Sequence, residues 1–153
     1  MEPYLVAISH PSLERAVLPF LEAIGSERRR FGRLASCDPK PFPSLVRKIV
    51  DPERIRFGVV VDGRVVGMAS IAHDGELSMA VAADQRGHGI GTMLMERAIE
   101  VAAVRGMGCL RMSSSHRSRP VAALAARHGW TVVDLGRGRL ELLLDVVRRL
   151  DAV

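Results

Sequence analysis

Aromatic residues and cysteines are scarce in this sequence, and each shortage argues against a class of protein. Phe, Trp and Tyr together make up 4% of the residues. No basic strand with interleaved aromatic side chains occurs, which disfavours an RNA-binding surface. The two cysteines, Cys37 and Cys109, are too few for a disulfide framework. Neither lies in a Cys/His cluster, so no metal site is expected.

Long hydrophobic runs are also missing. No segment approaches the about 20 consecutive apolar residues of a membrane span, and the opening MEPYLVAISHPS has no basic start followed by a long apolar core. The sequence therefore predicts a cytoplasmic protein with no membrane partner. Its 153 residues, 48% of them hydrophobic, fit one domain over residues 1–153 with a substantial core. A monomer and a homodimer both stay open.

Lysine is nearly absent, although the chain is basic. Its net charge is +5, and only Lys40 and Lys48 are lysines, so arginine supplies almost all of the positive charge. Without a basic surface rich in aromatic side chains, this charge is better explained by an anionic small molecule or an acidic partner than by nucleic acid.

The spacing of apolar residues predicts the order of the elements. Helical spacing is expected at 12–24, 27–34, 44–50, 90–105 and 118–128. Strand-like runs are expected at 55–61, 65–72, 76–82, 109–114, 130–135 and 140–146, with a further short apolar stretch at 4–8. Asp62-Gly63 indicates a type I′ hairpin, and Asp74-Gly75 a second turn. This order predicts an α/β (α+β) fold with helices on both faces of a sheet.

Three glycines alternate in QRGHGIG, residues 85–91, between a predicted strand and a predicted helix. A helix start has unpaired N–H groups and a partial positive charge, which together bind phosphate oxygens. Glycine lets these amides approach a ligand without an intervening Cβ, and Arg86 and His88 can add charge or donors at the rim. The alternative is a glycine-rich turn that only packs the helix on the strand.

Two familiar phosphate-binding motifs do not fit this loop. A dinucleotide fingerprint needs GxGxxG after the first strand of a parallel βαβ unit, whereas here the spacing is GxGxG and the preceding strands form an antiparallel meander. A P-loop needs Gly-Lys-Ser/Thr, and the loop has no lysine.

In this context RGHGIG, residues 86–91, resembles the acyl-CoA signature Q/R-x-x-G-x-G/A of the GNAT N-acetyltransferase superfamily. The preceding strand, the following helix and strand, and a helix ending in His-Gly-Trp at 128–130 come in the family order, so the resemblance covers about residues 44–146. SERRRFGRL (26–34) and ELSMAVAADQRGHGIG (76–91) are more narrowly similar to the catalytic domain of Pat-type protein-lysine acetyltransferases.

The superfamily resemblance implies a central mixed, mostly antiparallel sheet of about six to seven strands. It also implies acetyl-CoA as co-substrate, held by main-chain groups and without a metal. The residues implied for the pantetheine arm are Ala80, Val81 and Ala82, and those for the pyrophosphate are Arg86, Gly87, His88, Gly89, Ile90, Gly91 and Thr92. A strand amide near Ala80 would donate to the thioester oxygen.

The resemblance also implies a general base, Glu76, at the position where Pat-type relatives carry a catalytic glutamate. A base is needed because only about one lysine amine in a thousand is neutral at neutral pH. An ordinary carboxylate is a poor base, so the role requires that Glu76 be buried. Otherwise it is a surface residue beside a turn. Ala125 stands where many members carry a tyrosine that protonates the leaving thiolate, so no general acid is assigned.

The implied function is acetyl-CoA-dependent acetylation of a primary amine, with a protein lysine as the first choice of acceptor. A small-molecule amine is the alternative within the same enzyme class. A non-catalytic acyl-CoA sensor, favoured by the missing tyrosine, is the alternative outside it. The sequence identifies neither the acceptor nor the preferred acyl chain.

Overall fold

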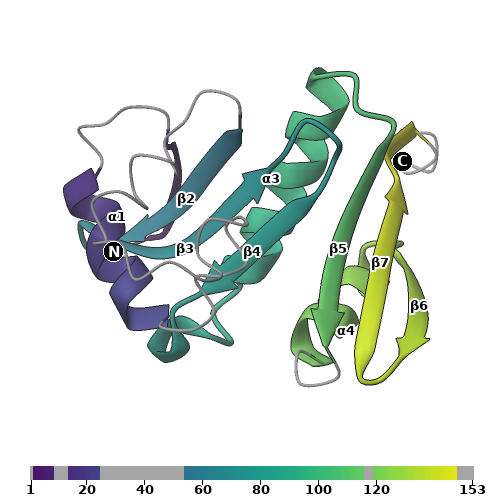
Figure 1. Ribbon diagram of the computed structural model, residues 1–153. Coiled ribbons are helices and arrows are strands. Elements are labelled where there is room, and N and C mark those ends of the chain that lie inside the picture. The colour runs from purple at the N-terminus through teal and green to yellow at the C-terminus, as the bar shows by residue number, and fades with distance from the viewer. Residues whose placement is uncertain (1, 9–13, 25–53, 116–118, 148–153) are drawn as a thin grey trace. The chain divides into compact units, whose positions relative to one another are not determined.

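The computed structural model describes residues 2–8, 14–24, 54–115 and 119–147 (Figure 1). Its elements are β1 (Tyr4–Ala7), α1 (Glu14–Ile24), β2 (Ile55–Val61), β3 (Arg64–Ile71), β4 (Leu77–Val81), the 3₁₀ helix η4 (Ala83–Gln85), α3 (Ile90–Val104), β5 (Cys109–Ser115), α4 (Arg119–Arg127), β6 (Thr131–Gly136) and β7 (Arg139–Asp145). The predicted helices at 27–34 and 44–50 lie outside the described residues.

The chain forms two compact units. The first comprises the described residues of Met1–His73 and Ser78–Leu94, and the second those of Asp74–Leu77 and Met95–Val153. The prediction of one domain over 1–153 stays a prediction. Among the described residues, no helix combines the length and the hydropathy that a membrane-spanning segment needs.

The first unit contains a four-stranded sheet in the order β1-β2-β3-β4. β1 and β3 both pair antiparallel with β2. Asp62 (φ 51°) and Gly63 (φ 74°) connect β2 to β3. A type I′ turn requires positive φ at both central residues, so the predicted hairpin is confirmed.

Helices cover both faces of this sheet. α1 contributes to a core cluster on one face, which consists of Ile8, Val17, Phe20, Leu21, Ile24, Val60, Val65, Met68, Ala80 and Ala82. On β3, Gly67 points to the face opposite that of its neighbour Met68. A Cβ on Gly67 would lie 2.8 Å from Ile90 Cγ2 and 3.1 Å from Leu94 Cδ1. The first turns of α3 therefore pack closely on the other face, as the predicted layering requires.

β4 differs from its predicted burial pattern. The alternation of residues 76–82 indicates one apolar face formed by Leu77, Met79 and Val81. In the structure Ala80 and Ala82 are also buried, with 6% and 8% of their surface exposed, because both join the core cluster beneath α1. The side chains of these two alanines therefore face packed core, and the Ala82 amide is also occupied, since it donates to Val66 O in β3.

The second unit contains a three-stranded antiparallel sheet in the order β5-β7-β6, which α4 contacts through β5 and β6. α4 ends as the sequence predicts, with Gly129 at φ 87° and the Trp130 amide donating to the Ala125 carbonyl at 3.0 Å. Both Leu124 and Trp130 are buried.

The predicted α/β fold with mostly antiparallel strands is confirmed, and its seven strands in the described residues divide into sheets of four and three. Within the described part of the chain, a parallel bridge joins Glu76 to Arg111 outside the named strands. It lies within the second unit, immediately before β4 begins.

Gly75→Ala is expected to destabilise the protein by roughly 2–5 kcal/mol in a urea unfolding experiment. Gly75 has φ 87°, and a Cβ there would overlap the main-chain carbonyl oxygen of Cys109 in β5. The left-handed conformation alone costs alanine about 1–2 kcal/mol. The steric overlap adds about 1–3 kcal/mol because a carbonyl fixed in a sheet has little room to move.

Gly106→Ala is the matched control, with φ 71° and no described atom within 4 Å of the added Cβ. Its free energy of unfolding should fall only by the cost of the left-handed conformation, about 1–2 kcal/mol. Equal losses in the two variants would show that the approach of Gly75 to β5 is unimportant for stability.

Candidate functional site

The glycine loop, residues 86–89, joins η4 to α3 in the first unit. Gly87 and Gly89 have φ of 81° and 80°, and among the described residues nothing lies within 4 Å of a Cβ built on either. Both positions therefore require glycine for their backbone conformation, while the close packing of helix on strand occurs at Gly67. The simple packing-turn interpretation does not explain these two glycines.

α3 begins with main-chain donors that the helix itself does not use. The first helical hydrogen bond runs from Met93 N to Gly89 O at 3.1 Å. The amides of Ile90, Gly91 and Thr92 consequently have no acceptor within the helix. Gly89 has no side chain with which to cap them, and the first turn of α3 contains no acidic residue. This helix end is a positive pole suited to phosphate oxygens.

Polar contacts within the first unit hold the loop against its sheet. Arg64 at the start of β3 and Asp84 in η4 form an exposed ion pair at 3.0 Å. The Ala82 amide donates to Val66 O in β3 at 2.8 Å. His88 is exposed, and its Nδ1 donates to the Gln85 carbonyl at 3.2 Å, since a carbonyl can only accept.

Arg86, the other predicted rim residue, is exposed. Sequence reasoning missed Arg64. The signal that it offered was an arginine directly after the hairpin glycine, at the start of the strand beside β4.

β4 is the last strand of its sheet, as the order β1-β2-β3-β4 requires. The main-chain groups on its outer edge have no strand partner within this sheet. Since the side chains of Ala80 and Ala82 are buried, a ligand at this edge would meet main-chain donors and acceptors. These are the groups that the predicted pairing with a pantetheine arm would use, and that pairing stays a prediction.

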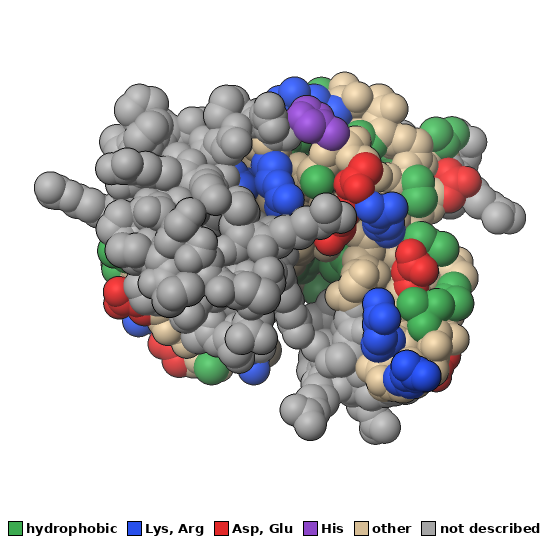
Figure 2. All heavy atoms as spheres, in the orientation of Figure 1, with side chains coloured by type: hydrophobic (Ala, Val, Ile, Leu, Met, Phe, Trp, Pro, Cys, Tyr) green, Lys and Arg blue, Asp and Glu red, His purple; other side chains and the backbone are tan. Residues whose placement is uncertain are grey.

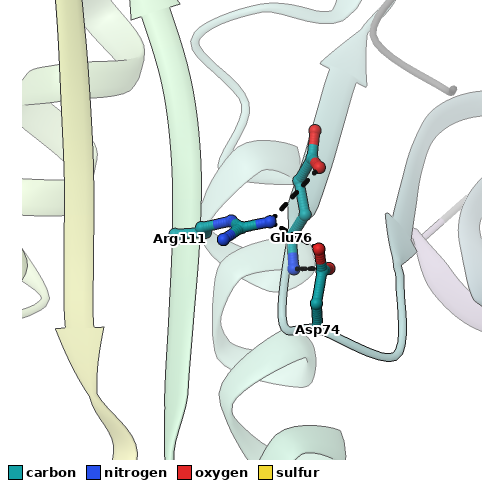
Figure 3. A network of polar contacts seen from close by, with 3 residues as sticks. All are labelled: Asp74, Glu76 and Arg111. Atoms are coloured by element: carbon teal, nitrogen blue, oxygen red, sulfur yellow. Dashed lines mark hydrogen bonds and ion pairs between the residues drawn. The ribbon is translucent and has the colours of Figure 1, made fainter. Parts of the chain in front are cut away.

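Glu76 belongs to a network of three charged side chains in the second unit, together with Asp74 and Arg111 (Figure 3). Arg111 Nη2 lies 2.5 Å from Asp74 Oδ2 and 3.8 Å from Glu76 Oε2. The Glu76 amide donates to Asp74 Oδ1 at 3.1 Å. The Arg111 amide donates to Gly75 O at 2.9 Å, which fixes the turn against β5.

The burial that a stronger base would require is not present at Glu76, whose side chain is 53% exposed. Glu76 is a surface residue beside a turn, which is the alternative that the sequence left open, and its role as base stays a prediction. Exposure does make the carboxylate accessible to an acceptor. Asp74 and Glu76 together carry two negative charges against one on Arg111, so the network has an excess negative charge that attracts protonated amines.

Sequence reasoning also missed Asp74 and Arg111 as partners of Glu76. The available signal was an acidic pair, Asp-Gly-Glu, and a lone arginine within the strand at 109–114. Ala125 is fully buried in α4 and offers no proton-donating group. The glycine loop belongs to the first unit and the Glu76 network to the second.

Charged side chains of both signs are interspersed over the described part of the face in Figure 2. They do not gather there into a single basic surface of the kind that nucleic-acid binding uses.

A family model described as "Acetyltransferase (GNAT) family" matches residues 21–130 of this chain. Solved structures with this fold include the GNAT domain of S. lividans PAT, which has a TM-score of 0.75 and 16% sequence identity, and the alignment covers 92% of this chain and 89% of that one. A putative acetyltransferase, yncA, from Salmonella typhimurium with its cofactor acetyl-CoA has a TM-score of 0.71 and 16% identity, with 94% of each chain covered.

Mutant forms of the spermidine/spermine N-acetyltransferase SpeG from Vibrio cholerae also share the fold, with a TM-score of 0.70 and 14% identity. The alignment covers 99% of this chain and 99% of that one. At these identities the structural likenesses establish the fold, and the family match extends over most of the chain.

Proposed function

This chain belongs to the acetyltransferase (GNAT) family, and we propose that it transfers an acetyl group from acetyl-CoA to a primary amine. The observation that carries the proposal is the start of α3. Three amides without helical acceptors follow a loop whose glycines, Gly87 and Gly89, need their left-handed backbone conformation. Such an end binds a diphosphate through N–H donors and the helix dipole.

The same unit has a second main-chain surface suited to the cofactor. The outer edge of β4 would pair with the pantetheine arm as an added strand, through main-chain groups of the segment Ala80, Val81 and Ala82. The Ala82 amide is not among these groups, because it already donates to Val66 O in β3. When bound, acetyl-CoA supplies an activated acetyl group as a thioester. An amide near Ala80 would donate to the thioester oxygen and stabilise the charge that develops there.

Glu76 is proposed as the base that removes a proton from the attacking amine. The carboxylate is exposed in the free protein, so the desolvation that strengthens a base would have to come from the bound coenzyme and amine. Its exposure lets it accept a proton from a substrate or from an intervening water. The excess negative charge of the Asp74, Glu76 and Arg111 network favours arrival of a cationic amine. The acetyl group would then pass directly to the amine while both substrates are bound. No residue is assigned as general acid, because a thiol with a pKa of about 8.5 leaves readily as its anion.

The acceptor proposed first is a lysine side chain of a protein, acetylated in the cytoplasm. It is supported by the similarity of residues 26–34 and 76–91 to Pat-type enzymes and by the shared fold of the S. lividans PAT domain. A small polyamine is the second candidate. The likeness to a spermidine/spermine N-acetyltransferase, which extends over 99% of both chains, favours it.

A thiol-release assay tests the proposal. Purified protein and acetyl-CoA are combined with a lysine-bearing protein panel, spermidine, spermine and free amino acids, and propionyl-CoA and succinyl-CoA replace acetyl-CoA in parallel. Acceptor-dependent release of CoA, with an acetylated amine found by mass spectrometry, is the expected result. Tight acetyl-CoA binding in calorimetry without release in any combination would overturn catalysis and leave the acyl-CoA sensor.

A further inference from the structure

Asp74 uses its two carboxylate oxygens for two different contacts. Its Oδ1 accepts the Glu76 amide at 3.1 Å, which shapes the turn before β4. Its Oδ2 lies 2.5 Å from Arg111 Nη2, while the distance from the same nitrogen to Glu76 Oε2 is 3.8 Å. The guanidinium is therefore bound mainly to Asp74, and its contact with Glu76 is looser (Figure 3).

This asymmetry matters for a base. A guanidinium bound tightly to Glu76 would stabilise the charged carboxylate and weaken its tendency to take a proton. A carboxylate beside Asp74 alone would be subject to repulsion between like charges. Because Arg111 is shared, its positive charge is largely offset by Asp74, and Glu76 keeps an accessible oxygen while its position beside β5 is retained.

We propose that Asp74 and Arg111 are positioning residues for Glu76, which hold its carboxylate beside β5 and balance each other's charge so that Glu76 can accept a proton from the amine. The inference rests on the proposed role of Glu76 as base. Asp74 and Arg111 do not touch the reacting atoms. Their task is to set the pH range in which Glu76 works as the base.

The other charged groups near the network are few among the described residues. His73 precedes Asp74 in the chain and is exposed. On β7, Glu141 and Asp145 pair with Ser113 and Cys109, the residues two positions to either side of Arg111 on β5, so both lie on the same sheet face as Arg111. Their charges are present in every variant considered below and do not affect the comparison.

Three variants test the pair through the pH dependence of kcat/KM for the amine, whose acid limb reports the base in the free enzyme. Asp74→Asn keeps an Oδ1 for the Glu76 amide and removes only the charge. The unbalanced Arg111 should then move the acid limb to lower pH and reduce the plateau several-fold. Arg111→Gln should move the limb to higher pH, because Asp74 and Glu76 then repel each other. The double variant should restore it close to the wild-type position.

The Arg111→Gln shift should be about half a pH unit, the size that one charge near 4 Å produces at a solvent-exposed site. The Asp74→Asn shift should have the opposite sign. Asp134→Asn is the control for Asp74→Asn, because Asp134 Oδ1 accepts the Gly136 amide at 2.8 Å in the same local geometry. Arg97→Gln is the control for Arg111→Gln, since Arg97 pairs with Glu100 at 3.3 Å and is 44% exposed against 43% for Arg111. Neither control should move the limb.

Opposite shifts that cancel in the double variant support the inference, and a purely structural role would not produce them. Shifts in the same direction, or unchanged profiles in variants with a wild-type acetyl-CoA affinity, overturn it. Glu76→Gln distinguishes a failure of the proposed base from a failure of the proposed positioning pair. If that variant keeps full activity, the proposed base is wrong. If it loses activity while Asp74→Asn and Arg111→Gln keep the wild-type profile, only the positioning pair is wrong.

Discussion

Glu76→Gln should lower kcat for acetyl transfer by about 10²- to 10⁴-fold, the usual contribution of a general base, while the dissociation constant of acetyl-CoA stays unchanged. Glutamine has the size of glutamate, so the turn, the bridge to Arg111 and the Glu76 amide contact to Asp74 should survive. What is lost is the group that accepts the proton. The measurement is thiol release with the best amine, accompanied by calorimetry with acetyl-CoA.

Glu100→Gln is the matched control, because Glu100 is also an exposed glutamate paired with an arginine, at 3.3 Å from Arg97 on α3. It should keep wild-type kcat. A Glu76→Gln protein with kcat within a factor of two of wild type would remove Glu76 from the mechanism. Loss of acetyl-CoA affinity together with kcat would instead point to a damaged fold.

Gly89→Val should weaken acetyl-CoA binding roughly 100-fold. Valine at a φ of 80° is strained, so the backbone rotates and turns the first amides of α3 away from the diphosphate. Losing two hydrogen bonds to a charged group, at a lower value of about 1.5 kcal/mol each, accounts for a factor of this size. Isothermal titration calorimetry with acetyl-CoA measures it.

Gly63→Val supplies the control. Gly63 lies in the β2–β3 hairpin with φ 74°, and among the described residues nothing lies within 4 Å of a Cβ on Gly63 or on Gly89. The two variants should lose similar stability, about 1–3 kcal/mol for the strained backbone, and only Gly89→Val should lose the cofactor. Unchanged affinity in Gly89→Val would contradict the proposed diphosphate site.

Local features of the fold could be predicted from the sequence. Asp62-Gly63 determines its own turn, because few residue pairs tolerate two successive left-handed conformations. Gly129 ends α4 because the residue after a helix often adopts a left-handed conformation, which favours glycine. Alternating glycines before a helix indicated an anion site, and the structure adds that Gly87 and Gly89 are needed for backbone conformation, with the close helix–strand packing at Gly67.

Features that depend on distant residues could not be predicted in this way. Asp74 and Arg111 are 37 positions apart, and no local periodicity connects a turn aspartate with an arginine in a later strand. The division of the strands into two sheets has a similar origin, since β5 pairs with β7, which is formed by residues far along the chain. The exposure of Glu76 could not be decided from the sequence, because a strand pattern does not reveal whether its first residue leaves the core.

The edge position of β4 has a consequence for handling the protein. An unpaired strand edge is a template on which other chains can add, and most proteins shield such edges with charge, bulges or a covering segment. β4 is the short apolar segment LSMAV and contains none of the charged or proline residues that usually discourage such pairing. A coenzyme lying along it would also act as its shield, so the protein should be most resistant to aggregation when stored saturated with CoA.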